Sequence, residues 1–269
     1  MLVFVFSILQ SGFAQDVSLE LQKSPALNES RISDLWMQQP DDVQIGFGTS
    51  SVRYPQQLPP SGHLSDTWKI RGWKNEKVNT QFLVWSKEGV KNFNWLLSDL
   101  KGDNGRTIGR DAFFTGPVQY VITDEFRDGC GYRKGADFDS SLVADIIRTD
   151  LFSSSVAPMN TQPVWLGIQI AVDVTPGLYK GELTVIADGR DHKLKIELTV
   201  IDRALPFIKN RSFQLDLWQH PAAIARVHNV SLWSNEHFSL MRNYYTMLAG
   251  IGQKAITASI VDEPWNHQT

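Results

Sequence analysis

Residues 175–201 decide the fold of the first part of the chain, and their sequence is TPGLYKGELTVIADGRDHKLKIELTVI. Pro176 sets φ for the first position of a turn, and Gly177 accepts the positive φ that a type II turn requires next. Apolar and polar residues then alternate through residues 193–201, which is the period of a strand with one buried face. Residues 188–191, DGRD, join this strand to residues 178–187. The stretch therefore predicts a β-hairpin with one face in water.

Short strand-like segments, separated by turn residues, extend from this hairpin over about residues 16–203, and no helical pattern interrupts them. In residues 78–85 the polar residues Asn79 and Gln81 share one face, while apolar residues point the other way. The same pattern recurs in residues 117–122 and 163–170. Because an open antiparallel sheet would leave its apolar face in water, we expect a β-sandwich of two sheets.

The pattern changes after DRALP, residues 202–206, which we take as a domain boundary. Residues 212–218 and 254–260 predict strands. Between them, Ser234 can cap a helix over about residues 234–249, and Gly250 and Gly252 can stop it. One apolar stripe at steps of three and four residues supports this helix: Phe238, Met241, Tyr245 and Leu248. Strand, helix and strand form a βαβ unit, whose strands should be parallel.

A single βαβ unit cannot close a barrel, and the chain stops nine residues after Ile260. We therefore expect a mainly β protein, with an N-terminal β-sandwich followed by an incomplete (β/α)8 TIM-barrel domain that holds the first βαβ unit only. The expected domains are a signal peptide at residues 1–14, the sandwich at 15–203, and the beginning of a truncated barrel at 204–269.

The leader prediction rests on an apolar run at residues 2–9, followed by small residues before a cleavage point after Ala14. No segment approaches the roughly 20 apolar residues of a spanning helix. Cys130 is the only cysteine, so intramolecular disulfides are impossible, and export without disulfides fits a bacterial periplasm or surface. With a net charge of −3, the chain lacks the excess of positive charge that favours binding to nucleic acid. We expect an exported protein that is periplasmic, cell-surface or extracellular.

Both predicted strand ends of the βαβ unit carry acidic and aromatic residues, and in α/β barrels this end of the strands forms the active-site face. Carboxylates contact hydroxyl groups, and tryptophan rings pack against sugar C–H bonds, so the set suits a glycan. The alternative is that the tryptophans cap the barrel core and the carboxylates are solvated loop charges. The predicted substrate-binding residues are Asp216, Trp218 and His220 at the first strand end, and Asp262, Glu263 and Trp265 at the second.

The sequence does not match the motifs of other common metal-binding and cofactor-binding sites. Residues 99–111 are rich in Asp and Gly, but Lys101 stands where a calcium loop needs an oxygen ligand, so the segment favours a hairpin turn. The histidines show no zinc-protease spacing, and no glycine loop fits a phosphate or a dinucleotide. We therefore expect no metal and no cofactor.

Several stretches resemble glycoside hydrolase family 123. Residues 71–79 (RGWKNEKVN), 126–133 (FRDGCGYR) and 174–181 (VTPGLYKG) are similar to the N-terminal sandwich of that family. Residues 213–219 (FQLDLWQ) and 253–265 resemble the start of its barrel.

This resemblance implies a hydrolase of the β-N-acetylgalactosaminidase type. The implied mechanism is retaining and substrate-assisted, so that the acetamido oxygen of the sugar attacks the anomeric carbon. An Asp-Glu pair orients the acetamido group and protonates the leaving oxygen. The resemblance places that pair on a later barrel strand, beyond Thr269, and not at Asp262-Glu263. We therefore expect no catalytic residue in the chain, which alone should be inactive.

A second hypothesis treats the sandwich as a noncatalytic carbohydrate-binding or spacer module. Four of its tryptophans are candidates for stacking on a glycan: Trp68, Trp73, Trp85 and Trp165. Core packing is expected for Trp85 and Trp165, which lie within predicted strands. A third hypothesis is a protein-interaction sandwich.

Overall fold

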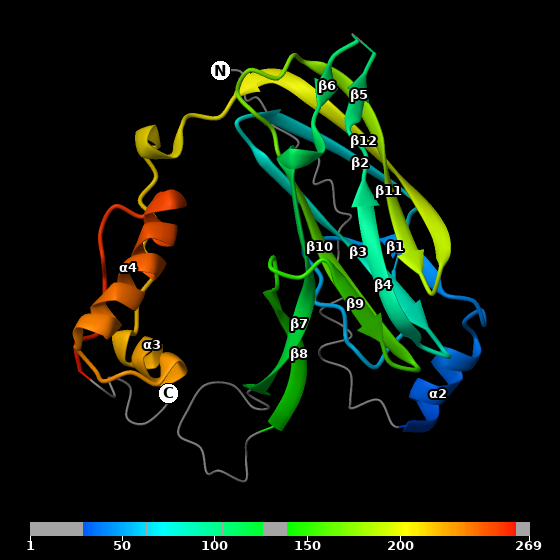
Figure 1. Ribbon diagram of the computed structural model, residues 1–269, viewed down its shortest axis with the longest axis horizontal. Coiled ribbons are helices and arrows are strands. Elements are labelled where there is room, and N and C mark those ends of the chain that lie inside the picture. The colour runs from blue at the N-terminus through cyan, green and yellow to red at the C-terminus, as the bar shows by residue number, and fades with distance from the viewer. Residues whose placement is uncertain (1–28, 63, 104, 126–138, 262–269) are drawn as a thin grey trace, which may run out of the picture. The chain divides into compact units, whose positions relative to one another are not determined.

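The computed structural model describes residues 29–261, apart from residues 63, 104 and 126–138. The chain divides into two compact units, Met1–Ala204 and Leu205–Thr269 (Figure 1). Each unit is described separately below. The predicted leader and Cys130 lie outside the described residues.

Two β-sheets form the first unit (Figure 1). One has five strands in the order β1-β3-β10-β7-β8, and the other follows the path β2-β12-β11-β4-β9, with β5 paired to β11 and β6 paired to β5. The pairs are antiparallel except β2 with β12. The strands are β1 (Gln44–Phe47), β2 (Thr67–Lys74), β3 (Lys77–Ser86), β4 (Val90–Leu97), β5 (Leu100–Gly102), β6 (Thr107–Ile108), β7 (Phe113–Glu125), β8 (Asp139–Ile147), β9 (Ser153–Val156), β10 (Asn160–Gln169), β11 (Gly177–Ala187) and β12 (Arg190–Ala204).

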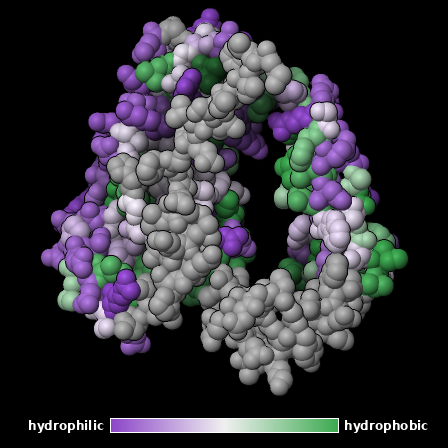
Figure 2. Space-filling model, turned by 180° about the vertical axis from the view of Figure 1, so that it is seen from behind, coloured by the Kyte–Doolittle hydropathy of each residue, from purple (hydrophilic) through white to green (hydrophobic). Residues whose placement is uncertain are grey.

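Both sheets contribute fully buried side chains to one core. Phe82 and Val164 come from the five-stranded sheet, and Leu183 and Ile196 come from the other. The view from behind shows mostly hydrophilic residues on the outward surface of this unit (Figure 2). This distribution is that of a β-sandwich, in which inward positions along each strand are apolar and outward ones are wet.

The predicted hairpin is confirmed as β11 and β12, which pair from Gly177 with Val200 to Ala187 with Arg190. The turn residues Asp188 and Gly189 both have positive φ, 45° and 81°. This is the turn geometry that matches the twist of two antiparallel strands. Two of the three other predicted strands lie within β3 and β7, the third, 163–170, overlaps β10 up to Gln169, and residues 99–111 contain the β5–β6 hairpin.

Helix α2 (Glu29–Met37) contradicts the expectation that the first unit is all-β. Trp36 of this helix is 1% exposed and packs in a second hydrophobic cluster with Tyr54, Leu83 and Trp85. Strand β3 is consequently buried on both of its faces over Gln81–Ser86. Gln81, which its pattern places on a polar face, is 3% exposed. The helix was missed because its buried contacts are with residues far away in the sequence.

The second unit contains helices α3 (Pro221–His228) and α4 (Asn235–Gly250), which contact each other, and a short 3-10 turn, Ile208–Asn210. The helix predicted at 234–249 is confirmed as α4, and the Ser234 hydroxyl accepts a hydrogen bond from the His237 N–H at 3.1 Å. The predicted apolar stripe is wrong at Phe238, which is 50% exposed, whereas the neighbouring His237 is fully buried. Helix α3 was not predicted.

The two segments predicted as strands, residues 212–218 and 254–260, are extended but irregular. They meet only at isolated bridges, Leu215 with Gln253 and Gln219 with Ala258, and both bridges are parallel. The parallel direction was predicted correctly, and the regular strands were not. No helix among the described residues is long and apolar enough to span a membrane.

Candidate functional site

The side chain of Gln253 makes hydrogen bonds between the two extended segments at a point where their backbones do not pair with each other. The amide of Gln253 accepts a hydrogen bond from the Leu217 N–H at 3.2 Å and donates one to the Leu217 carbonyl at 3.2 Å. It also donates to the Ala255 carbonyl at 2.8 Å. Because the side chain occupies the place where backbone groups would pair, the backbone ladder is interrupted without leaving Leu217 unsatisfied. No sequence signal singled out Gln253.

Beyond Gln253 the backbone pairing resumes and fixes the end of the first segment. The Gln219 N–H donates to the Thr257 carbonyl at 2.7 Å, and the Ser259 N–H donates to the Gln219 carbonyl at 3.1 Å. The predicted residues Trp218 and His220 flank this anchored residue. They therefore lie at the carboxyl end of a segment that runs parallel to its neighbour, as predicted.

His220 has an unusual environment. It immediately precedes α3, whose first residue is Pro221, and its own carbonyl accepts a hydrogen bond from the Ala223 N–H at 3.0 Å. Both of its ring nitrogens are buried, and neither has a hydrogen-bond partner among the described residues. A buried polar group without a partner costs about 1–3 kcal/mol, so such groups are rare and point to an additional ligand or partner.

Trp218 and Asp216, in contrast, face solvent. Trp218 is 68% exposed, so part of its ring surface is open to a ligand. Asp216 is also exposed. Asp216, Trp218 and His220 thus share one short segment but differ in environment, since the first two are exposed and the ring nitrogens of His220 are buried. The other predicted residues, Asp262, Glu263 and Trp265, lie outside the described residues.

His237 is a second histidine that sequence reasoning missed. Its Nδ1 accepts a hydrogen bond from the Trp233 N–H at 3.0 Å, so its Nε2 carries the proton and donates to the Pro221 carbonyl at 2.9 Å. The side chain therefore ties the start of α4 to the residue that follows His220. His237 thus has a positioning role, and both of its ring nitrogens have hydrogen-bond partners. The ring nitrogens of His220 have none among the described residues.

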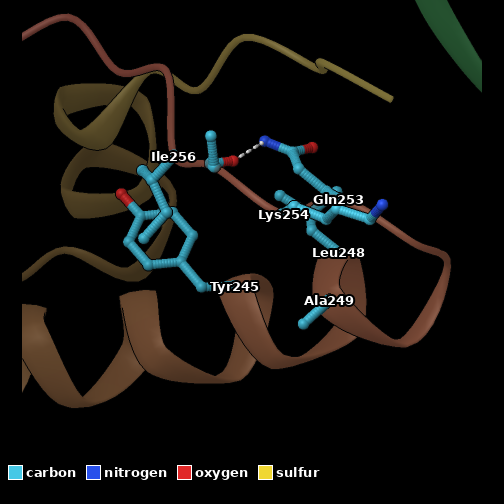
Figure 3. A pocket seen from close by; sticks show the side chains of 7 residues that line it. Tyr245, Leu248, Ala249, Gln253, Lys254 and Ile256 are labelled. Atoms are coloured by element: carbon cyan, nitrogen blue, oxygen red, sulfur yellow. Dashed lines mark hydrogen bonds between the residues drawn. The ribbon is translucent and has the colours of Figure 1, made fainter. Parts of the chain in front are cut away.

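Figure 3 shows a pocket between α4 and the segment that follows it, with a volume of about 210 Å³. It is lined mainly by apolar groups of Tyr245, Leu248 and Ile256, with Gln253 and Lys254 at one side. Burial raises the pKa of the Tyr245 hydroxyl, which therefore stays protonated near neutral pH. None of the predicted substrate-binding residues lines this pocket. Among the described residues there is also no cluster of three potential metal-binding side chains.

The four candidate tryptophans of the sandwich differ in their burial. Trp68 and Trp85 are 7% and 8% exposed and belong to hydrophobic clusters. Trp73 is 42% exposed. Trp165 is half-buried and lines a cavity on the five-stranded sheet. Core packing is thus confirmed for Trp85, and only partial burial is found for Trp165.

Comparison with protein families gives two matches that together cover most of the described chain. Residues 47–187 match the glycoside hydrolase 123 N-terminal domain, and residues 218–269 match the glycoside hydrolase 123 catalytic domain. The chain belongs to glycoside hydrolase family 123. The resemblance stated from the sequence is therefore confirmed, and the candidate site falls at the beginning of the segment that matches the family 123 catalytic domain.

Among solved structures, a family 123 glycoside hydrolase from Clostridium perfringens, analysed for glycolipid glycan hydrolysis, has a TM-score of 0.71 at 22% identity. The match covers 84% of this family 123 chain and 39% of the Clostridium chain, so our chain spans well under half of that protein. It shows a shared fold.

Two weaker matches are the sporulation control protein Spo0M from Bacillus subtilis and the CooA pilin subunit from Escherichia coli. Spo0M has a TM-score of 0.28 at 9% identity, over 62% of this chain and 52% of its own. CooA has a TM-score of 0.28 at 11% identity, over 60% of this chain and 99% of its own. The comparison with curated proteins found no match.

Proposed function

We propose that the protein is part of an exported glycoside hydrolase that cleaves glycans containing N-acetylhexosamine, of the N-acetylgalactosamine type. The observation that carries this proposal is the match of residues 218–269 to the family's catalytic domain. The matched segment begins at Trp218. His220, two residues later, holds two buried ring nitrogens without partners among the described residues. A sugar hydroxyl or amide is a ligand that can satisfy either nitrogen, as a donor or as an acceptor.

In this proposal the second unit is the opening part of a (β/α)8 barrel. The extended segments around Leu215 and Gln253 are its first two strands, and α4 is the crossover helix. The parallel bridges between these segments support the assignment, because a parallel pair needs a helical crossover and barrel strands are parallel. Residues 15–203 would then form the sandwich domain, after a leader at residues 1–14.

The substrate would lie across the carboxyl ends of these strands. The exposed ring of Trp218 offers a flat apolar surface for sugar C–H groups, and Asp216 is an acceptor for hydroxyl groups. Asp262, Glu263 and Trp265 remain proposed contacts on the next segment. The proposed mechanism is retaining and substrate-assisted, with the acetamido oxygen as the nucleophile, so it needs no cofactor and no protein nucleophile.

No described residue is assigned as the catalytic acid. The proposal places the Asp-Glu pair outside this chain, so the chain alone is expected to bind a substrate analogue without hydrolysing it.

The test is to assay the protein encoded by the full reading frame on an aryl β-N-acetylgalactosaminide and on the matching aryl β-galactoside, which lacks the acetamido group. We expect cleavage of the first with net retention of configuration, observed by NMR, and no cleavage of the second. His220→Ala should lower kcat/KM by about 10- to 100-fold, the equivalent of one strong hydrogen bond. His192→Ala, in the sandwich, is the control and should have no effect. Cleavage of neither substrate would refute the proposal.

A further inference from the structure

The cavity that Trp165 lines lies on the sandwich, on the outer face of the five-stranded sheet. Its volume is about 170 Å³. The preceding residue of β10, Val164, is fully buried in the core between the two sheets. Because adjacent residues of a strand point to opposite faces, the Trp165 side chain is directed away from that core. The described lining residues of the cavity all belong to the first unit.

The ring of Trp165 is only partly occupied by protein contacts. Its two cross-strand neighbours are Gln81 on β3 and Gly116 on β7, and the backbone of Arg148 occupies the space where a side chain at position 116 would lie. The indole N–H groups of Trp36, Trp85 and Trp95 each donate to a protein acceptor at 3.0–3.1 Å. For the indole N–H of Trp165, the structure shows no acceptor among the described residues. This tryptophan thus retains a free donor beside a cavity.

A β-bulge brings a carboxylate to the same cavity. In the β7–β8 pair, Gln119 is opposite Ile146 and Tyr120 is opposite Ala144, so Asp145 is the extra residue. In a regular strand, Ala144 and Asp145 would point to opposite faces, but here both line the cavity. Bulges re-aim side chains in this way and are frequent beside functional sites.

Arg53, on the loop that follows β1, supplies a cation opposite this carboxylate. Its Nη2 lies 3.9 Å from Asp145 Oδ1, and the two side chains are 61% and 54% exposed. An exposed pair at this distance contributes little to stability, so both groups can turn to a ligand. Together they present donors and an acceptor with no net charge, which favours a neutral polyhydroxylated ligand over an anion or a cation.

The wall that carries Arg53 is fixed before any ligand arrives. Gln81 is buried, and its side-chain amide donates to the carbonyl oxygens of Thr49 and Val52, both at 2.9 Å. These bonds hold the loop against the sheet, and binding therefore needs little reorganisation.

We propose that this cavity binds one pyranose ring of a neutral glycan. The ring packs against Trp165, and neighbouring hydroxyl groups contact Arg53 and Asp145. The volume is below the roughly 300 Å³ at which pockets for drug-sized ligands begin, so a single ring fits and an oligosaccharide does not. The site would hold glycan on the sandwich whether or not the second unit takes part in hydrolysis.

The experiment is isothermal titration calorimetry of the whole chain with the methyl β-glycosides of galactose, N-acetylgalactosamine and glucose. We expect at least one glycoside to bind with a dissociation constant on the order of 1 mM, as befits a ligand of about 13 non-hydrogen atoms. Arg53→Ala and Asp145→Ala should each raise this constant about tenfold or more. Trp165→Phe, which keeps a ring but removes the N–H, should raise it less.

The matched control is the pair Lys69 and Glu197 on the other sheet, whose charged atoms lie 3.7 Å apart and in which Lys69 is exposed and Glu197 is partly buried. Lys69→Ala should bind the glycoside as the unchanged protein does, and thermal unfolding should show that every variant is folded. If no glycoside binds, or if Asp145→Ala and Arg53→Ala bind it with unchanged affinity, the proposal is wrong. Neither result bears on the aryl-glycoside assay of the second unit.

Discussion

The two units of the chain hold their structure in different ways. In the sandwich, side chains from both sheets, such as Phe82 and Leu183, are fully buried in one continuous core. In the second unit, many large apolar residues are exposed among the described residues, and those exposed by two thirds or more are Phe213, Trp218, Val227, Met247 and Ile260. Its two extended segments and two helices are joined instead by buried amide and imidazole side chains, Gln253 and His237. Burial of apolar side chains is the main source of stability in the first unit, whereas hydrogen bonds of buried polar side chains contribute a larger share of the stability of the second unit.

The largest expected effect is therefore in the core of the sandwich. Phe82→Ala should lower the free energy of unfolding by about 3–5 kcal/mol, because it removes a fully buried ring and leaves a cavity. Met247→Ala, at a residue of α4 that is 68% exposed, is the contrasting variant and should change it by about 0.5 kcal/mol or less.

Urea unfolding, with hydrogen exchange of peptides from each unit, would measure both changes. A loss of more than about 1 kcal/mol in Met247→Ala would show that the apolar surface of the second unit is covered in solution, and the contrast between the units would fail.

The second effect tests the hydrogen-bonded unit directly. Gln253→Leu keeps a buried side chain of similar size but removes both partners of Leu217. We expect a loss of about 1 kcal/mol, the lower end of the penalty for unpartnered polar groups, because the backbone of Leu217 is only partly buried. Gln214→Leu, at an exposed glutamine of the segment that contains Leu217, is the control. Exchange of the amides around Leu217 should accelerate only in the first variant, and equal exchange in both would contradict a role for Gln253.

The same contrast explains how much of the fold could be predicted. The β11–β12 hairpin is local, so its alternating pattern and its Asp188-Gly189 turn were enough. Helix α2 is short and is stabilised by Trp36 against residues far along the chain, which no local pattern reveals. The irregular segments of the second unit depend on one side chain, Gln253, and the sequence predicted regular strands there.

For the candidate site, local reasoning could name a segment but not the environment of each side chain, and the substrate-binding role of its residues stays a prediction. Trp218 and His220 were predicted from their residue types at a strand end, and the structure places them on either side of Gln219, at the end of an extended but irregular segment. The ring nitrogens of His220 have no partner among the described residues, whereas both ring nitrogens of His237 have one, and the sequence does not show this difference. The roles of Asp262, Glu263 and Trp265 stay predictions, because these residues lie outside the described part of the chain.

An effect of similar size is expected at the start of α4. Ser234→Ala removes the hydroxyl that accepts from the His237 N–H, and should cost about 1 kcal/mol. Ser239→Ala, at an exposed position within the same helix, lacks this role and serves as the control. Because His237 also links α4 to Pro221, the Ser234 variant should speed exchange in both helices. Faster exchange confined to α4 would mean that the cap acts on its own helix alone.

The smallest effect belongs to the wet face of the sandwich, where Lys193 Nζ lies 2.8 Å from Glu182 Oε1. The hydrogen bond and charge of Lys193 hold the pKa of the Glu182 carboxyl below its ordinary value of 4.5. A carboxyl whose pKa is lowered in the folded state adds stability above the pKa of the unfolded state and loses it as the pH falls through the folded value. The contribution of the pair should therefore be complete above the ordinary Glu pKa of 4.5 and be lost as the pH falls through the lowered pKa of Glu182. It should be small even at neutral pH, because both side chains are solvent-exposed and screened by salt. NMR titration should show the Glu182 pKa rising towards its ordinary value in Lys193→Ala, with the melting temperature nearly unchanged. A clear fall in melting temperature at pH 7 would mean that surface pairs, and not only the apolar core, set the stability of the sandwich.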